Sequence, residues 1–236
     1  MSHREGPLVL KLGLLGRSIK HSRSKEMYEK ILGETVDYHL LDYDTYEEIP
    51  RIKNLFTQGF LGLSITYPFK KSFIDQVVIN DDVVKKIGAI NCMKSEGEYV
   101  LATNTDYLAA KEIVKTFTNT EFLILGSGNM SNVFKIVFEE LGLTYKVLFR
   151  KSHGDLNLIN YENYCSSELK TVLINCCSRE FIFNSKLPTN VLFWDMNYSF
   201  SPHNHLKEAR FDYREGTDLL SLQASFALSF WNISPI

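Results

Sequence analysis

The stretch EFLILGSGNMS (residues 121–131) decides the fold of the second half of the chain. Glu121–Leu125 is an apolar run of strand length, and it leads directly into the glycine turn Gly126-Ser127-Gly128. Behind the turn, apolar side chains recur at helical spacing as far as Gly142, a residue typical of a helix end. A strand, a glycine turn and a helix in this order predict the opening unit of a Rossmann-like domain.

The glycine turn has the chemistry of a nucleotide-binding site. Its glycines allow a pyrophosphate to approach the backbone, and the free N–H groups of the following helix attract the negative charge. Ser131 occupies the third small position of the G-x-G-x-x-G pattern. The predicted cofactor contacts in this turn are Gly126, Ser127, Gly128, Asn129 and Met130. A tight structural turn without a ligand is the alternative interpretation.

The end of the next strand favours NADP over NAD. Domains that bind NAD carry an acidic residue about 20 residues beyond the turn, whereas NADP-binding domains place a cation there. Here the strand at 145–149 is followed by Arg150 and Lys151, and no acid stands at that position. We therefore predict that Arg150 and Lys151 pair with the 2′-phosphate of NADP. The alternative is a solvated, charged turn.

The remaining pattern predicts an α/β protein with two domains. Strands at 8–15, 36–42 and 60–66 alternate with helices at 25–32 and 46–56, which indicates parallel βαβ units. Residues 91–104 read as a hairpin, and a helix at 106–117 leads into the second α/β unit. Further strands are expected at 171–176 and 191–196, and an apolar helix at 219–231 should be buried.

Composition excludes several classes of protein. The 236 residues include 26 Lys and Arg against 28 Asp and Glu, so the chain lacks the basic surplus expected of a nucleic-acid binder. The polar start and the absence of a long apolar run argue against a signal peptide and a membrane span, and predict a cytoplasmic protein. The 4 cysteines are expected to be reduced thiols. His203 and His205 lack a third ligand nearby, so no metal is predicted.

Several polar residues in the first half sit where ligands bind in α/β sheets. Ser22 and Ser24 follow the first strand and could grip a carboxylate, although Ser24 could equally be the N-cap of the next helix. Thr66 and Lys70 follow the third strand, beyond the end at which open sheets bind ligands. Asn91 and Asp106 stand at the ends of the hairpin strands, where an Asx turn or a helix cap is the structural alternative.

Taken together, these segments resemble the shikimate dehydrogenase family. The family's motifs HSxSP, GxNVTxPxK, GAxNT, GxNTDxxG, DxxY and GxxMLxxQ match, in order, His21–Lys25, Gly62–Lys70, Gly88–Cys92, Ala102–Ala109, Asp195–Tyr198 and Gly216–Gln223. The matches are spread over nearly the whole chain.

The resemblance implies an N-terminal substrate-binding catalytic domain at 1–105, a Rossmann-like NADP-binding domain at 106–215, and a C-terminal helix at 216–236 that packs back on the first domain. It also implies the reversible reduction of 3-dehydroshikimate to shikimate in aromatic amino-acid biosynthesis. Lys70 and Asp106 would form the catalytic pair. The substrate contacts implied are Ser22, Ser24, Thr66, Asn91, Gln223 and Tyr198, and Gly216 would join the cofactor site.

The chain departs from the family pattern mainly on the cofactor side. The family's NATPxGM loop reads Asn175-Cys176-Cys177-Ser178-Arg179, without Pro, Gly or Met. In the first half, Tyr28 and Glu29 stand where His and Asn are usual. Two other functions stay open at this point: a dehydrogenase of quinate or a related cyclic hydroxy acid, and a non-catalytic nucleotide- or metabolite-binding homologue. A monomer or a homodimer is expected.

Overall fold

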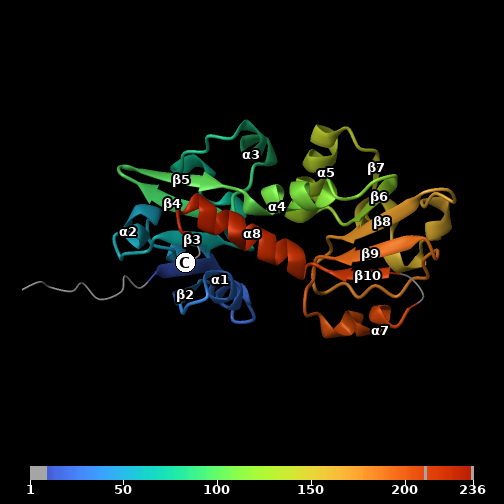
Figure 1. Cartoon of the computed structure of the whole chain (residues 1–236), viewed down its shortest axis with the longest axis horizontal. Helices are drawn as coiled ribbons and strands as arrows, with labels where there is room; N and C mark the ends of the chain where they lie inside the picture. Colours follow the sequence, from blue (N-terminus) through green and yellow to red (C-terminus); the bar gives the residue numbers. More distant parts are fainter. Residues whose placement is uncertain (1–9, 210–211, 235–236) are drawn as a thin grey trace, which may run out of the picture. The chain divides into compact units, whose positions relative to one another are not determined.

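The computed structural model describes residues 10–209 and 212–234, which form two α/β units (Figure 1). The first unit comprises Met1–Leu108 and Leu220–Ile236, and the second comprises Ala109–Leu219. Both boundaries lie inside a helix, namely α4 (Thr105–Val114) and α8 (Thr217–Phe230), whereas the boundaries expected after residues 105 and 215 lie near the starts of these helices. The expected fold class, two α/β domains of which the second is Rossmann-like, is confirmed.

The first unit is built on a mixed five-stranded sheet of order β2-β1-β3-β4-β5. Its strands are β1 (Lys11–Gly16), β2 (Asp37–Asp42), β3 (Gly62–Ile65), β4 (Cys92–Glu96) and β5 (Tyr99–Thr103). The first three strands run parallel, and β4 and β5 form an antiparallel hairpin beside β3. All residues of β3 are buried, so this strand lies in the core of the unit. Residue 8, where the first strand was predicted to begin, lies outside the described residues.

Three helices of the first unit connect its strands: α1 (Ser24–Leu32), α2 (Ile52–Phe56) and α3 (Asp82–Ile87). The single helix predicted over 46–56 is wrong. A 3₁₀ turn at Tyr46–Glu48 is separated from α2 by Pro50, which lacks a backbone N–H and cannot continue a helix in its interior. Helix α3 was not predicted, although Asp81 caps it by accepting the N–H groups of Val83 and Val84.

Helix α8 brings the end of the chain back to the first unit. Trp231, which follows this helix, packs on β3 so closely that a Cβ at Gly62 would lie 2.2 Å from the indole ring. The Trp231 indole Nε1 donates a hydrogen bond to the Met93 carbonyl oxygen at 2.9 Å. The prediction that the C-terminal helix packs on the first domain is therefore confirmed, and Gly62 is required by this close approach.

The second unit has an all-parallel five-stranded sheet of order β10-β9-β8-β6-β7. Its strands are β6 (Thr120–Leu125), β7 (Tyr145–Leu148), β8 (Lys170–Asn175), β9 (Val191–Asp195) and β10 (Asp212–Glu215). Its helices are α5 (Asn129–Leu141), α6 (Arg150–His153) and α7 (Asn204–Lys207). Helix α5 starts at Asn129, directly after Gly128, and ends before Gly142, as the glycine turn and the apolar spacing predict.

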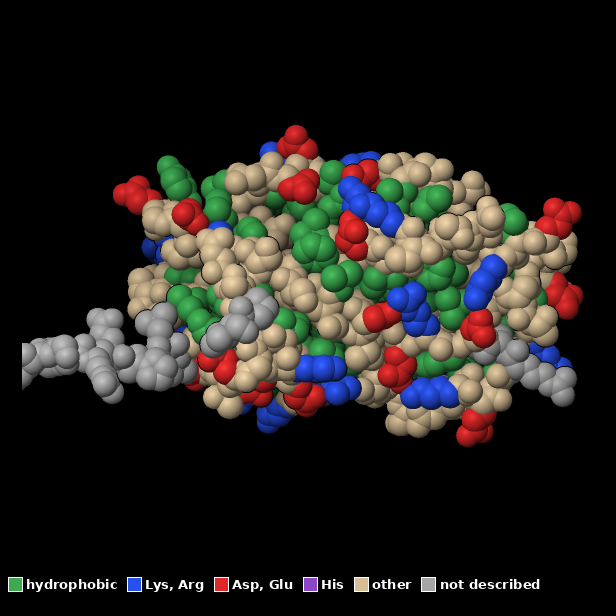
Figure 2. Space-filling view, viewed as in Figure 1, with side chains coloured by type: hydrophobic (Ala, Val, Ile, Leu, Met, Phe, Trp, Pro, Cys, Tyr) green, Lys and Arg blue, Asp and Glu red, His purple; other side chains and the backbone are tan. Residues whose placement is uncertain are grey.

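The surface carries charges of both signs. On the face in Figure 2, Lys and Arg side chains are interspersed with Asp and Glu, without a broad area of either sign. No helix among the described residues combines the length and apolarity needed to cross a lipid bilayer. The four cysteines are free thiols.

Candidate functional site

In each sheet, predicted site residues lie at the carboxyl ends of the strands, near the point where the strand order reverses. In the first unit the strand order reverses between β1 and β3, and in the second it reverses between β6 and β8. Connections leave such a pair of strands in opposite directions, so a crevice forms at their carboxyl ends, and open α/β sheets bind ligands there. This rule locates two candidate sites, one in each unit.

The ends of β1 and β3 are packed tightly together. Leu15 pairs with Ile65, and the Thr66 N–H donates to the Leu15 carbonyl oxygen at 2.9 Å. A Cβ at Gly16 would lie 2.4 Å from Thr66 Cγ2, so only glycine leaves room for this threonine. Thr66 is half-buried, at the edge of the sheet where the predicted substrate contacts gather.

Lys70 and Asp106 form an ion pair at this edge, with Nζ and Oδ2 2.6 Å apart. Their side chains are 16% and 12% exposed, so the pair is shielded from bulk water but still reachable by a ligand. Lys70 lies in the 3₁₀ turn after β3, and Asp106 lies in the first turn of α4. Residues distant in sequence therefore meet as a charged pair, as expected of a proton-transfer site.

Asn104 fixes the start of α4 and with it the Asp106 carboxylate. Its Oδ1 accepts the Tyr107 N–H at 3.0 Å, and its Nδ2 donates to the Ala89 carbonyl oxygen at 2.9 Å. The Ile90 N–H in turn donates to the Lys70 carbonyl oxygen at 2.8 Å. Ala89 and Ile90 are neighbours in one buried segment, which is therefore hydrogen-bonded both to Lys70 and to Asn104 at the start of α4. These bonds fix the geometry of the Lys70–Asp106 ion pair.

Three buried polar side chains continue the site away from the ion pair. Asn91 Oδ1 accepts the Thr105 N–H at 2.7 Å, and the Thr105 hydroxyl lies 3.2 Å from Asn91 Oδ1 and 3.1 Å from Gln223 Oε1. Both amide oxygens therefore face Thr105, which leaves the amide NH₂ groups of Asn91 and Gln223 to face elsewhere. Thr105 was not singled out from the sequence, although it stands between Asn104 and Asp106 in the matched motif.

Ser22 and Ser24 form a hydroxyl pair. The Ser22 hydroxyl donates to Ser24 Oγ at 3.2 Å, and the Ser24 N–H donates to Ser22 Oγ at 3.3 Å. The alternative that Ser24 is an N-cap is wrong, because α1 begins at Ser24 and its cap position is Arg23, which makes no side-chain capping bond. Ser22, rather than Ser24, satisfies a free N–H at the start of α1, and the Ser24 hydroxyl is left to accept from Ser22.

A buried aromatic layer lies beneath the polar residues. The Tyr28 hydroxyl is 3.0 Å from Ser64 Oγ, and its ring centroid lies 5.5 Å from that of Trp231. Burial is the main cause that raises the pKa of Tyr28 well above its usual value, so this phenol stays neutral. The sequence showed Tyr28 only as a departure from the family pattern; its pairing with Ser64 comes from the fold.

The second site is a pocket of about 370 Å³ at the β6 and β8 ends. Its lining residues are Gly126, Ser127, Gly128, Phe149, Arg150, Lys151, Leu156, Cys176, Cys177, Ser178 and Phe181. Gly126 has a φ of +105°, and a Cβ there would lie 3.1 Å from the Cys176 backbone, so a glycine is required. A Cβ at Gly128 would meet open space.

The pocket unites the glycine turn with the two predicted cations. Arg150 and Lys151 are both exposed, and they belong to the same cavity as Gly126 and Ser127. A concave cradle of backbone and positive charge fits a phosphorylated nucleotide. Cys177, which also lines this pocket, is held protonated because burial raises the pKa of its thiol to about 11.

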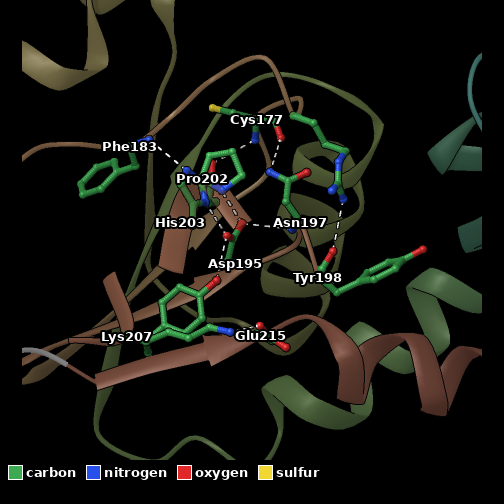
Figure 3. Close-up of polar contacts among 12 residues, drawn as sticks. Cys177, Phe183, Asp195, Asn197, Tyr198, Pro202, His203, Lys207 and Glu215 are labelled. Carbon is green, nitrogen blue, oxygen red and sulfur yellow. Dashed lines mark hydrogen bonds and ion pairs between the residues drawn. The ribbon is translucent and has the colours of Figure 1, made fainter. Parts of the chain in front are cut away.

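The other predicted residues of this half lie outside the pocket lining. Asn129 and Met130 are the first residues of α5. Gly216 approaches the end of β9, where a Cβ would lie 2.9 Å from the Asp195 carbonyl oxygen. The Tyr198 carbonyl oxygen accepts a hydrogen bond from Arg179 Nη1 at 3.2 Å (Figure 3). Tyr198 belongs to the second unit, whereas the other predicted substrate contacts belong to the first.

Comparisons with known proteins agree with this reading of the chain. Residues 14–93 match the family model of the shikimate dehydrogenase substrate binding domain. The NADP(+) shikimate dehydrogenase of Methanococcus vannielii is 33% identical over 129 residues, which span 51% of this chain and 45% of that protein. The enzyme of the same name from Helicobacter acinonychis is 28% identical over 254 residues, which span 95% of this chain and 93% of that protein.

Solved structures show the same fold. The shikimate 5-dehydrogenase of Thermus thermophilus, crystallised in complex with NADP(H) and shikimate, superposes with a TM-score of 0.73 at 21% identity. The superposition covers 97% of this chain and 95% of that protein, so both units of the fold are shared.

Proposed function

The chain belongs to the shikimate dehydrogenase family, and on that premise we propose that it catalyses the NADP-dependent, reversible reduction of 3-dehydroshikimate to shikimate. The observation that carries the proposal is the Lys70–Asp106 pair, which stands partly buried at the switch point of the first sheet. A protein that only binds a metabolite has little need of a lysine and a carboxylate held 2.6 Å apart. The non-catalytic alternative is therefore disfavoured.

A polyhydroxylated carboxylic acid needs many fixed donors, and the first unit supplies them. The hydroxyls of Ser22 and Ser24 would bind the substrate carboxylate. Thr66 and the amide NH₂ groups of Asn91 and Gln223 would bind the ring hydroxyls, and Tyr198 would be a further substrate contact. Because Thr105 holds both amide oxygens, the donors that face the ligand are already oriented before it binds.

The second unit fits NADP. Gly126, Ser127 and Gly128 would receive the pyrophosphate, with Asn129, Met130 and Gly216 as further contacts of the cofactor. Arg150 and Lys151 would pair with the 2′-phosphate, for which the pocket has no carboxylate competitor among its lining residues. When bound, NADP supplies the hydride chemistry that no amino-acid side chain can provide.

Lys70 and Asp106 divide the proton chemistry between them. The Lys70 ammonium can stabilise negative charge on the substrate oxygen and deliver a proton to it during reduction. Asp106 holds Nζ in place and can share the adjacent hydroxyl of the substrate. In the oxidation of shikimate the same lysine, once deprotonated, accepts the hydroxyl proton.

The proposed role in the cell follows from this chemistry. The reaction would serve aromatic amino-acid biosynthesis in the cytoplasm, carried out by a monomer or a homodimer acting on a small-molecule substrate. A quinate dehydrogenase would use the same lysine and carboxylate, so substrate preference must be measured.

Purified protein should be assayed by NADPH or NADH absorbance with shikimate or quinate and NADP or NAD, in all four pairings. We expect shikimate with NADP to give the highest kcat/KM. Preference for quinate would shift the assignment to the related dehydrogenase. Binding of both ligands without turnover in any pairing would support the non-catalytic alternative.

A further inference from the structure

The wall of the second-unit pocket is an irregular segment that needs outside support. Residues 176–190 join the parallel strands β8 and β9, yet the segment contains no regular helix or strand. Cys176, Cys177, Ser178 and Phe181 of this segment line the pocket. Backbone N–H and C=O groups that are not paired within secondary structure must find other partners. The Cys176 N–H donates to the Leu125 carbonyl oxygen at 2.9 Å, whereas the backbone groups of Cys177 and Phe183 are bonded by side chains.

Two groups of hydrogen bonds attach the segment to the rest of the unit, and we call each of them a fastening. The first fastening lies at Cys177. Its N–H donates to Asn175 Oδ1 at 3.2 Å, and its carbonyl oxygen accepts from Asn197 Nδ2 at 3.1 Å. Asn175 ends β8 and Asn197 follows β9, so the wall is held between the ends of two adjacent strands.

The second fastening lies at Phe183, whose backbone is bonded by two histidines of one short segment, His203 and His205; Figure 3 shows the bond to His203. The Phe183 N–H donates to His203 Nε2 at 3.0 Å. The Phe183 carbonyl oxygen accepts from His205 Nε2 at the same distance of 3.0 Å. Ser178 and Phe181 lie between the two fastenings, so this part of the pocket wall is tied down on both sides.

A buried carboxylate joins the two fastenings. Asp195, at the end of β9, is fully buried and accepts from Asn175 Nδ2 and the Asn197 N–H, each at 3.0 Å. Its other oxygen lies 2.5 Å from His203 Nδ1 and accepts the Tyr213 hydroxyl at 3.0 Å. In Figure 3 His203 stands between Asp195 and Phe183.

The hydrogen bonds determine which nitrogen of His203 carries the proton. Because the Phe183 N–H points at Nε2, that nitrogen is an acceptor and has no proton. The proton is therefore on Nδ1, which donates it to Asp195. The imidazole acts as a rigid link of fixed orientation between a strand end and the pocket wall.

We propose that Asp195 and His203 are positioning residues for NADP binding: through Phe183 and Cys177 they hold the pocket wall that packs against the glycine turn. This inference rests on the proposed function, because it assigns the pocket to NADP. The corresponding loop of the family contains Pro, Gly and Met, which residues 175–179 of this chain lack. The proposal explains how the segment still acquires a defined conformation, since buried hydrogen bonds to side chains hold its backbone.

Two substitutions of His203 separate its two bonds. His203→Asn keeps an NH₂ donor for Asp195 but cannot reach the Phe183 N–H. His203→Gln can reach that N–H with its amide oxygen and serves as the rescue variant. Phe138→Leu is the matched control, because Phe138 is buried in the same unit, stacks on Phe122 and does not line the pocket.

The measurements are the dissociation constant of NADP alone, amide exchange in the 177–183 segment, the melting temperature, and the KM for shikimate. His203→Asn should weaken NADP binding by about tenfold, the effect of losing one buried hydrogen bond, and should speed exchange at Phe183. His203→Gln should recover part of both. The KM for shikimate should stay near the wild-type value in each variant.

The controls decide between positioning and general stability. Phe138→Leu should lower the melting temperature without changing NADP binding. If His203→Asn destabilises the protein but binds NADP normally, or if Phe138→Leu weakens NADP binding to the same degree, the positioning role is overturned. If the wild type binds NADP but does not oxidise shikimate, the proposed function fails while the binding comparison still tests the pocket wall. A wild type that does not bind NADP contradicts both.

Discussion

Lys70→Ala removes the cation at the centre of the proposed chemistry. The substitution leaves the proposed substrate-binding side chains in place, since none of Ser22, Asn91 and Gln223 is hydrogen-bonded to Lys70 in the structure. It removes the proposed proton donor to the substrate oxygen and deprives the Asp106 carboxylate of its partner at 2.6 Å. Its effects on turnover and on folding can be estimated separately.

The expected loss in kcat is about 10²–10⁴-fold, the usual contribution of a general acid, which corresponds to about 3–5 kcal/mol in the barrier. The Asp106 side chain is 12% exposed and would lose a charged partner, which should lower the free energy of unfolding by about 1–3 kcal/mol. A domain of ordinary stability tolerates that loss and stays folded. Turnover should therefore fall far more than stability.

The assay is steady-state reduction of NADP by shikimate, with kcat and both KM values determined beside the melting temperature. Lys71→Ala is the matched control, because Lys71 is the next residue in the same 3₁₀ turn but is exposed. We expect the control to behave like the wild type. A double variant of Lys70 and Asp106 should lose less than the product of the two single losses, because the pair acts as one unit.

Wild-type turnover in Lys70→Ala would refute the proposed role of the lysine. A loss confined to the KM for shikimate, with kcat unchanged, would instead make Lys70 a binding residue. Equal losses in the Lys70 and Lys71 variants would point to damage of the turn rather than to chemistry.

Three further outcomes are expected. Arg150→Ala should raise the KM for NADP by about tenfold or more and leave the KM for NAD nearly unchanged, because the ion pair that is lost is with the 2′-phosphate. An equal rise in KM for both cofactors would exclude this specificity. Replacing Ser22 and Ser24 together by Ala should weaken shikimate binding by about 1.5–3 kcal/mol for each bond to the carboxylate, with little change in melting temperature; normal binding would show that the hydroxyl pair is not the carboxylate site. Alkylation of Cys177 should be slow near neutral pH and accelerate as pH rises towards its thiol pKa of about 11, because the thiolate is the reacting form, and NADP should protect it; fast, unprotected alkylation at neutral pH would contradict the pocket assignment.

The local sequence pattern is sufficient to predict those elements whose ends are marked by neighbouring residues, such as glycines. The β6 strand, the glycine turn and α5 follow from an apolar run, two glycines and helical spacing, all of them nearest-neighbour information. The prediction over 46–56 failed because apolar spacing was given more weight than Pro50, whose missing N–H ends a helix locally. Strand β10 was missed because its four residues, Asp212–Glu215, carry no apolar alternation and depend on pairing with β9.

The candidate site was predictable where a motif carries its own chemistry. Lys70 and Asp106 can be predicted from the sequence because both stand at strand ends in matched motifs, and the structure brings them into contact. Thr105, Ser64 and the Asp195–His203 link were not identified, since each acts through a partner far away in sequence. His203 in particular looks like half of an incomplete metal motif in the sequence, whereas the fold gives its two nitrogens separate structural partners.

Transfer of hydrogen from the nicotinamide to the substrate carbon is the step that both sites are proposed to serve. It can be followed by incubating the protein with 3-dehydroshikimate and NADPH that carries deuterium at both positions of the nicotinamide C4, and analysing the product by mass spectrometry and NMR. The expected product is shikimate with a single deuterium on the carbon that was the ketone carbon of 3-dehydroshikimate. The wild type and Lys71→Ala should form it, and Lys70→Ala should form it far more slowly. Absence of product, or shikimate without deuterium at that carbon, would contradict the proposed reaction.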